Sequence, residues 1–167
     1  MKSRVVKILI AIAVIAAAIG ILFCTTRTVA IEIRKDPATP QSPIDKIRTV
    51  ARLNNIPEED LLAISAQESS LGKAKVGDSG CSRGWFHINL CANPEAKDLI
   101  GDPEQEAAWV VNRLIRYGYR TDRKLAIARY NSPAKPNFAY AELVEKRLKE
   151  LDLFLAPYEA SGGQTPR

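Results

Sequence analysis

An uncharged segment near the amino end of the chain constrains its fold more than any other feature. Residues 8–26, between Lys7 and Arg27, are mostly Ile, Leu, Val and Ala. About 20 apolar residues in a helix span the hydrocarbon core of a bilayer. Burial in a globular core is the alternative, but no other part of the chain could surround the segment. We therefore expect residues 8–26 to meet a membrane.

The charges beside this segment leave two membrane roles open. Three basic residues precede it, which is typical of a signal peptide and of an anchor whose amino end stays in the cytoplasm. A signal peptide would end near Ala30, but the apolar run is long for a signal peptide and Arg27 falls within the cleavage region. We expect residues 1–34 to form an uncleaved anchor, with a cleaved signal segment as the alternative.

The distribution of charge argues against a nucleic-acid partner. The formal net charge is +5, but residues 1–36 hold six of the 24 basic residues and two of the 19 acidic ones. The rest of the chain keeps 18 basic and 17 acidic residues and is nearly neutral. The excess basicity flanks the apolar segment, which fits membrane topology better than DNA binding.

A proline-rich stretch separates the membrane segment from the folded part of the chain. Residues 35–43 hold three prolines and no apolar period, which is typical of an extended linker. The following residues 44–155 are enough for one globular domain with its own core. Residues 156–167, which end in a polar, Gly-containing sequence, predict a disordered tail.

Apolar residues recur at helical spacing through this domain, and capping residues mark where helices start. Ser42 and Asp102 are cap acceptors, each followed by Pro at the first helical position. No regular alternation is long enough for a large sheet, so we expect a mainly α domain with a small β-hairpin or an irregular cleft wall. The predicted helices cover about residues 43–53, 57–72, 102–118, 122–131 and 137–154.

Residues 66–89 combine a helix end, a Gly/Ser loop and an aromatic cluster. Glu68 shares a predicted helix face with Leu61 and Ile64, so its carboxyl should project from an apolar wall near the end of the helix. Burial and the negative end of the helix dipole both raise the pKa of a carboxyl group. A carboxyl that is protonated near neutral pH can act as a general acid in glycosidic bond cleavage. The alternative is an ordinary exposed Glu near a helix end.

Other residues of this stretch suit a carbohydrate ligand. Glycoside hydrolysis usually needs a second carboxylate, and Asp78 is the candidate because neighbouring glycines let its loop return across a cleft. A turn residue is the alternative role for Asp78. Aromatic, imidazole and amide groups that could contact sugar rings belong to Trp85, Phe86, His87 and Asn89. Core packing of one of the two aromatics is the competing interpretation.

The histidine and cysteine content limits the chemistry of the site. His87 is the only histidine, so a multi-histidine metal site is excluded, and we expect neither a metal nor a cofactor. Cys81 and Cys91 bracket the aromatic cluster. If the domain lies outside the cytoplasm, a disulfide between them would stiffen the cleft wall, whereas two free, buried thiols are the alternative.

Three motifs, in a fixed order, resemble a known family. They are Gln67-Glu68-Ser69-Ser70, Gly84-Trp85-Phe86-His87-Ile88-Asn89 and Ala128-Arg129-Tyr130-Asn131-Ser132-Pro133. Their order and spacing are similar to the Glu-Ser, Gly-Leu-Met-Gln-Ile and Ala-Tyr-Asn-Ala-Gly motifs of the lysozyme-like soluble lytic transglycosylase domain. The resemblance covers about residues 44–151 and implies a lysozyme-like α+β fold.

The resemblance also implies an activity and roles for residues of the site. Glu68 would be the single acid/base that cleaves the MurNAc-β-1,4-GlcNAc bond of peptidoglycan and leaves a 1,6-anhydromuramoyl product. Ser69 matches the Ser beside the acid, Tyr130 the Tyr whose hydroxyl approaches the Glu, and Asn131 an Asn that shapes the site. The chain departs from the family where His87 replaces a Gln and where Ser132-Pro133 replace Ala-Gly.

A second resemblance keeps hydrolysis open. Residues 68–80 are similar to goose-type lysozyme, in which Asp78 would match an acid that holds the hydrolytic water, while Asn89 stands where a further Asp is usual. Loss of that acid favours transglycosylation over hydrolysis, and a non-catalytic peptidoglycan-binding module is a further alternative. The expected partners are peptidoglycan strands and, through residues 8–26, a membrane, with a monomeric domain facing the periplasm or cell wall.

Overall fold

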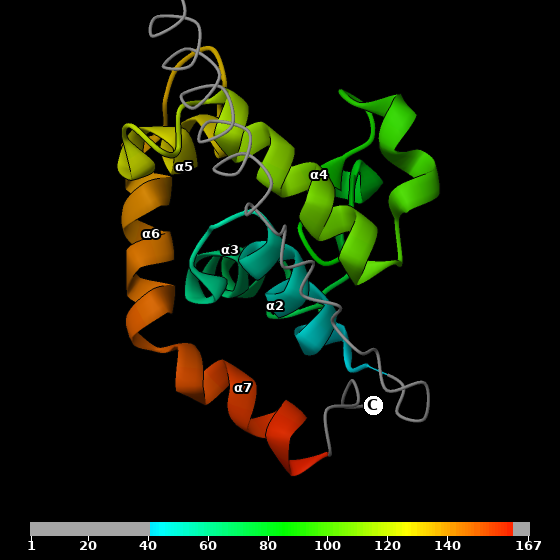
Figure 1. Cartoon of the computed structure of the whole chain (residues 1–167). Helices are drawn as coiled ribbons and strands as arrows, with labels where there is room; N and C mark the ends of the chain where they lie inside the picture. Colours follow the sequence, from blue (N-terminus) through cyan, green and yellow to red (C-terminus); the bar gives the residue numbers. More distant parts are fainter. Residues whose placement is uncertain (1–40, 162–167) are drawn as a thin grey trace, which may run out of the picture. The chain divides into compact units, whose positions relative to one another are not determined.

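The structure is a computed structural model that describes residues 41–161 (Figure 1). The predicted membrane segment, most of the predicted linker and the last six residues lie outside this range. Within the described part of the chain, no helix is long and apolar enough to cross a bilayer. The described residues therefore correspond to the globular domain predicted for residues 44–155.

The described residues form a mainly helical domain with one small sheet, as the sequence predicts. The α-helices are α2 (Pro43–Leu53), α3 (Glu58–Ser69), α4 (Pro103–Arg116), α5 (Arg123–Asn131), α6 (Phe138–Lys149) and α7 (Leu151–Ala160). Two short 3₁₀ helices, Asp78–Gly80 and Pro94–Leu99, lie between α3 and α4.

The sheet lies in the segment between α3 and α4. Its strands β1 (Val76–Gly77), β2 (Ser82–Arg83) and β3 (Ile88–Asn89) are antiparallel and pair in the order β1-β2-β3. The sequence predicts a small hairpin or an irregular wall here. The structure has one strand more than a hairpin, because residues after the aromatic cluster return to pair with β2.

The predicted helix starts are confirmed by their caps. The Ser42 hydroxyl accepts the N–H of Asp45, and the Asp102 carboxylate accepts the N–H of Glu104, which satisfies donors that the first helical turn leaves unpaired. The second predicted helix ends earlier than expected, at Ser69. Ser70 adopts the left-handed conformation that commonly ends a helix.

The carboxyl-terminal part of the fold differs from the prediction. Instead of one helix over residues 137–154 and a disordered tail from residue 156, two helices meet where Glu150 leaves helical geometry (φ −103°, ψ 8°) (Figure 1). Leu151, Leu155 and Tyr158 share one face of α7 and are buried. Their burial stabilises residues 156–160 as helix. The rest of the predicted tail, after residue 161, lies outside the described range.

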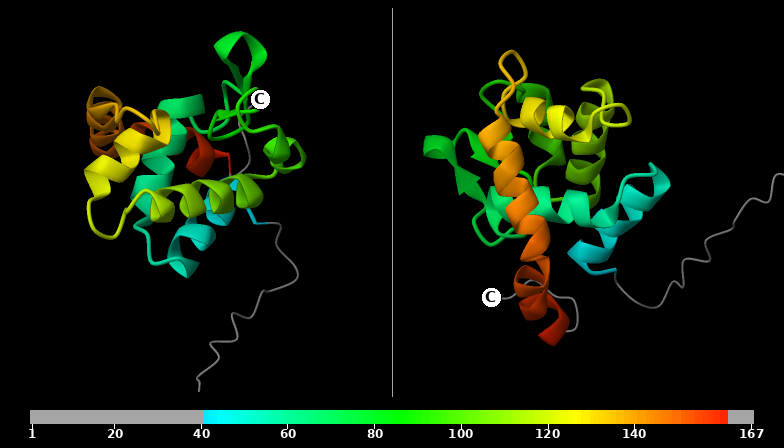
Figure 2. Two further views of the ribbon diagram at one scale, coloured as in Figure 1. Left: turned by 90° about the horizontal axis from the view of Figure 1, so that it is seen from above. Right: turned by 90° about the vertical axis from the view of Figure 1, so that its left-hand side faces the viewer.

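Helix α3 lies at the centre of the domain (Figures 1 and 2). It packs against α2, α6 and α7, and residues 61–66 are buried on every side of the helix. A helix that is buried all round is fixed by its neighbours rather than by one amphipathic stripe. The carboxyl end of α3 is therefore a rigid place from which to present a side chain.

A buried polar network fixes the other end of α3. Asp60 is 3% exposed and accepts hydrogen bonds from the guanidinium of Arg123 at 2.6 and 2.7 Å and from the hydroxyl of Tyr119. Arg123 also binds Glu145 on α6. Charge-assisted bonds of this kind join α3 to α5 and α6, and they satisfy a carboxylate that would otherwise be costly to bury.

Candidate active site

A cleft of about 280 Å³ opens between the end of α3, the sheet, α4 and α5. It brings together residues that are far apart in the sequence, from the three motifs and from one helix that none of the motifs includes. The lining residues are Glu68, Asp78, Ser82, His87, Ile88, Asn89, Ala92, Asn93, Trp109, Arg113, Tyr130, Asn131 and Pro133. Five of the predicted contact residues thus surround Glu68 in one cavity.

Glu68 is the most perturbed carboxyl of this cleft. It lies in the last turn of α3, and its side chain is 15% exposed. Burial raises the pKa of Glu68 from 4.5 to about 7, and the negative charge of Asp78 adds to the increase, while a hydrogen bond from Tyr140 opposes it. Glu68 can therefore hold a proton near neutral pH and release it, as the sequence predicts.

The tyrosine that binds Glu68 is not the predicted one. The Tyr140 hydroxyl donates to Oε1 of Glu68 at 2.5 Å. Tyr130, for which the sequence predicts this role, lines the cleft but donates its hydroxyl to the carbonyl of Phe86 at 2.8 Å. The two rings lie 6.4 Å apart. Tyr130 is correctly placed in the site, but Tyr140 on α6 makes the contact with the acid.

His87 faces Glu68 from the sheet side of the cleft. Its Nε2 lies 2.6 Å from the carbonyl oxygen of Ala74, so Nε2 carries a proton and donates it to this acceptor. Its Nδ1 then points toward the acid, 3.9 Å from Oε2 of Glu68. His87 takes a left-handed backbone conformation (φ 45°), and this turn directs the ring into the cleft.

Three predicted contact residues are structural instead. The side chains of Trp85 and Phe86 are 4% and 0% exposed, so neither offers a face to a ligand. Ser69 is fully buried and donates to the carbonyl of Trp85 at 2.7 Å, as Ser65 does at 2.9 Å. Trp85 and Phe86, which the sequence predicts to contact sugar rings, fill the core beneath the cleft, and the two serines bind the backbone of Trp85.

Glu106 of α4 holds the same aromatic segment from the other side. Its buried carboxylate accepts hydrogen bonds from the backbone N–H groups of Trp85, Phe86 and Gly101 at 2.7, 3.3 and 2.8 Å. Burial raises the pKa of Glu106, and these donors oppose the increase. A side chain at Gly84 would collide with this carboxylate, which explains the glycine before Trp85. No motif of the sequence includes Glu106 or indicates this role.

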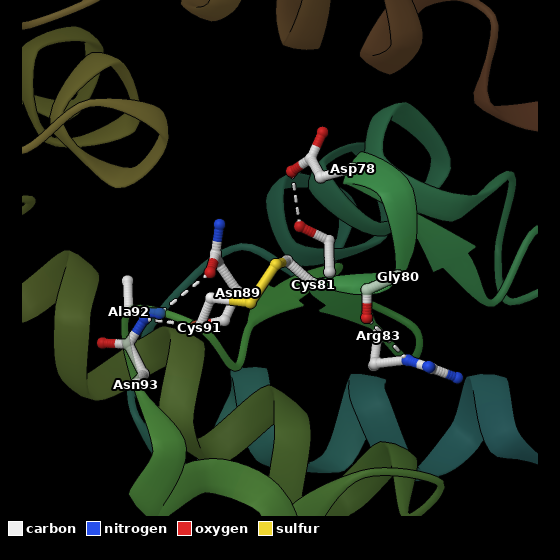
Figure 3. Close-up of a disulfide and its surroundings, with 9 residues drawn as sticks. Asp78, Gly80, Cys81, Arg83, Asn89, Cys91, Ala92 and Asn93 are labelled. Carbon is white, nitrogen blue, oxygen red and sulfur yellow. Dashed lines mark hydrogen bonds between the residues drawn. A yellow bond between two sulfur atoms is a disulfide. The ribbon is translucent and has the colours of Figure 1, made fainter.

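The remaining predicted polar residues line the cleft as expected. Asp78 accepts a hydrogen bond from the Ser82 hydroxyl at 2.6 Å, and Figure 3 shows its second oxygen free of that bond. The side-chain oxygen of Asn89 accepts the N–H of Ala92 at 3.0 Å. Asn131, at the end of α5, accepts a bond from the Asn137 amide at 2.8 Å. Each group is held by the protein while it faces the cavity.

A disulfide joins the two ends of the outer cleft wall. Cys81 and Cys91 are bonded, with their Cα atoms 5.4 Å apart, which confirms the predicted pairing (Figure 3). The bond encloses β2, the aromatic pair and β3. Closing a loop of this length stabilises the folded state by about 2–3 kcal/mol. The wall that carries His87 and Asn89 is therefore constrained both by the sheet and by a covalent link.

Helix α4 supplies two further lining residues, Trp109 and Arg113, which belong to none of the three sequence motifs. Trp109 is half-buried, and the guanidinium of Arg113 lies 4.2 Å from the centre of its indole ring. Arg113 also donates to the side-chain oxygen of Asn93. Trp109 lies beside the buried face of α4, and nothing in its local sequence indicates a cleft, so its place there depends on how α4 packs.

Comparisons with known proteins add no identification. No family model, no curated protein and no solved structure matches the chain. Among residues 41–161 no group of three or more His, Cys, Asp or Glu side chains is arranged to hold a metal ion. The function must therefore be argued from the chemistry of the cleft.

Two substitutions should move the pKa of Glu68 in opposite directions. Tyr140→Phe removes the hydrogen bond that favours the carboxylate, so the pKa should rise above about 7. Asp78→Asn removes a repelling charge, so the pKa should fall. A carbon-13 NMR titration of the Glu68 carboxyl measures both shifts, with Asp98→Asn, an exposed acid outside the cleft, as control. Shifts in the same direction would contradict the proposed contacts.

Proposed function

We propose that the chain is a peptidoglycan lytic transglycosylase in which Glu68 is the only catalytic acid/base. The observation that carries this proposal is the cleft carboxyl whose pKa is raised to about 7 by burial. Such a group can give a proton to a leaving oxygen and take one back at the same pH. The order of the three sequence motifs, whose residues meet around this carboxyl, supports the same choice.

The proposed reaction uses one carboxyl twice. Protonated Glu68 donates its proton to the glycosidic oxygen between MurNAc and GlcNAc as the C1–O bond breaks. The resulting carboxylate then accepts the proton of the muramoyl 6-hydroxyl while this oxygen bonds to C1. The product is a 1,6-anhydro ring, Glu68 is protonated again, and no water is consumed. Asp78 is exposed and Glu68 is largely buried, so of these two cleft carboxyls only Glu68 has an environment that favours the protonated form.

Hydrolysis is the second candidate, and Asp78 is the observation that favours it. Its carboxylate lines the same cleft and is close enough to raise the pKa of Glu68. An inverting hydrolase places a second carboxylate where it can activate water on the far side of the sugar. In that reaction Asp78→Asn would abolish turnover, whereas transglycosylation through Glu68 alone would retain it.

The proposed setting is the cell wall, and the disulfide supports it. Disulfides persist outside the cytoplasm, and peptidoglycan is reached from the same side of the membrane. A membrane anchor in residues 8–26, with a monomeric domain beyond it, would hold the cleft near its substrate. A binding module without turnover would use the same setting, because His87 and Ser132-Pro133 depart from the family motifs.

Product analysis tests the proposal. The full chain, purified in mild detergent, should release soluble fragments from purified peptidoglycan. Mass spectrometry of their muramoyl ends should find 1,6-anhydro groups, which weigh one water less than reducing ends. Reducing muramic acid ends would establish a hydrolase instead. Binding to peptidoglycan without any released fragment would show a binding module.

A further inference from the structure

The charges of the cleft are arranged unequally across it. The carboxyls of Glu68 and Asp78 lie on the side of α3 and the loop, whereas Arg113 comes from α4. Arg113 is the one Lys or Arg among the described residues that line the cavity. Burial raises the pKa of Tyr130 on the cleft wall, and the positive charge of Arg113 opposes this increase. A ligand in this cleft therefore meets acids at one side and a cation at the other.

The guanidinium of Arg113 is held in one orientation before any ligand binds. It stacks on Trp109 and donates to Asn93, and a longer contact of 3.4 Å reaches the hydroxyl of Tyr117. Glu95 is 3.9 Å away and 67% exposed, so this ion pair is weak. A guanidinium has five N–H donors, and these contacts use two of them within the described residues. The others remain for a ligand.

A stacked and half-buried guanidinium is suited to a carboxylate. Its planar fork matches the two oxygens of a carboxylate, and stacking on indole reduces the entropy lost on binding. The side chain of Arg113 is 23% exposed, so water screens such a contact only in part. A neutral polymer of N-acetylglucosamine has no group for this site. A muramoyl residue has one, because its lactyl ether carries either a free carboxylate or a stem peptide with carboxylates of its own.

We propose that Arg113, positioned by Trp109 and Asn93, is a specificity-determining residue that binds a carboxylate attached to the muramoyl residue of the glycan. The inference rests on the proposed function, because it takes peptidoglycan as the polymer in the cleft. It goes further in naming the substrate class: the chain prefers glycan strands with acidic substituents to neutral ones. The acidic group lies against α4, away from Asp78, and so fixes the direction of the strand in the cleft.

Binding measurements on a variant without turnover test this preference. Full-length Glu68→Gln is titrated calorimetrically with soluble, uncross-linked peptidoglycan strands and with the same strands after their carboxylates have been converted to methylamides. The acidic strands should bind about tenfold more tightly. Adding Arg113→Gln should remove this difference by weakening the acidic strands alone. Arg116→Gln, an exposed Arg on α4 outside the cavity, makes the same charge change and should leave the preference intact.

The source of the carboxylate is resolved by a third ligand. Strands from which an amidase has removed the stem peptides carry a free lactyl carboxylate. If these strands still bind more tightly through Arg113, the lactyl carboxylate is the ligand. If only the intact strands show this Arg113-dependent preference, the ligand is a carboxylate of the stem peptide. A salt titration of the Glu68→Gln chain, from about 50 to about 500 mM, supplies a test that needs no Arg113 variant. Only the acidic strands should bind more weakly as salt increases.

The outcomes separate this inference from the proposed function. The carboxylate site would be overturned if acidic and methylamidated strands bound with equal affinity. It would also be overturned if Arg113→Gln weakened the binding of both kinds of strand equally. Either result would stand even where the unsubstituted chain releases fragments. If the unsubstituted chain released nothing from peptidoglycan, the proposed function would fail, although an Arg113-dependent preference for acidic strands would still stand.

Discussion

Glu68→Gln should reduce the release of peptidoglycan fragments by about a thousandfold or more. The amide keeps the shape of the side chain and can still accept the hydrogen bond from Tyr140, so the cleft should be preserved. What it loses is the proton that the leaving oxygen needs. Turnover is measured as soluble muropeptides released by the full chain. Full activity in this variant would exclude the single-acid mechanism.

The same substitution should stabilise the fold at alkaline pH. The pKa of Glu68 is raised in the folded state from 4.5 to about 7, so the stability that the protonated carboxyl provides is complete below about pH 4.5. It is lost as pH rises through 7, when the carboxyl must be charged in a buried position. Glutamine avoids this loss, so the variant should gain up to about 3 kcal/mol at about pH 8 and nothing near pH 4.

A matched control distinguishes this effect from a general change of charge. Glu59→Gln removes the same charge from the same helix, but Glu59 is exposed and lies in the first turn. Urea unfolding at both pH values should show no gain in the free energy of unfolding for Glu59→Gln. This variant should also keep full activity in the release of muropeptides. A gain at pH 8 that is equal in the two variants would contradict the buried, destabilised carboxylate at position 68.

Glu106→Ala should destabilise the domain by about 3–5 kcal/mol. The substitution leaves three N–H groups without their acceptor, the buried ones of Trp85 and Phe86 and that of the exposed Gly101. It also opens a cavity in the core. Urea unfolding followed by circular dichroism measures the change in the free energy of unfolding. Glu104→Ala, an exposed position two residues earlier in α4, should change it by less than about 1 kcal/mol.

Glu106→Gln should lower the free energy of unfolding by less than Glu106→Ala does, and its effect should be confined to the segment around Trp85 and Phe86. Its amide oxygen can still accept one backbone N–H, but its NH₂ group would face donors. Because the carbonyl of Phe86 is the acceptor for Tyr130, movement of this segment should disturb the cleft wall as well as the core. Retention of full stability by both Glu106 variants would show that the aromatic segment is held by packing alone.

Local signals in the sequence were sufficient for the helix starts. Ser42 and Asp102 form the predicted caps, because a cap depends on residues within one turn. The carboxyl-terminal end was mispredicted for the opposite reason. Pro157 and the polar residues after it indicate a tail, whereas burial of Leu155 and Tyr158 against distant parts of the core makes this segment helical. Tertiary packing decided the structure there.

The candidate site likewise contains residues that the local sequence predicts and others that depend on tertiary packing. Glu68, His87 and Asn89 could be predicted from one continuous stretch, because their chemistry and their neighbours are local. Tyr140 and Arg113 could not, since an isolated Tyr or Arg on an amphipathic helix carries no signal of the cavity it will face. Trp85 and Phe86 show the converse error, because aromatic residues beside polar ones indicate a sugar site and a core equally well.

The contacts of Tyr140 and Tyr158 determine when, during synthesis, the site can be completed. Tyr140 follows Glu68 by 72 residues, and Tyr158 follows Leu71, whose carbonyl it binds, by 87 residues. A ribosome makes the chain from the amino end, so the acid is present long before the residues that surround it. A nascent chain that stops after α5 has both ends of the disulfide and the acid itself, but not the helices that give the carboxyl its environment. The last quarter of the chain thus supplies Tyr140, the residue that contacts the Glu68 carboxyl in the folded domain.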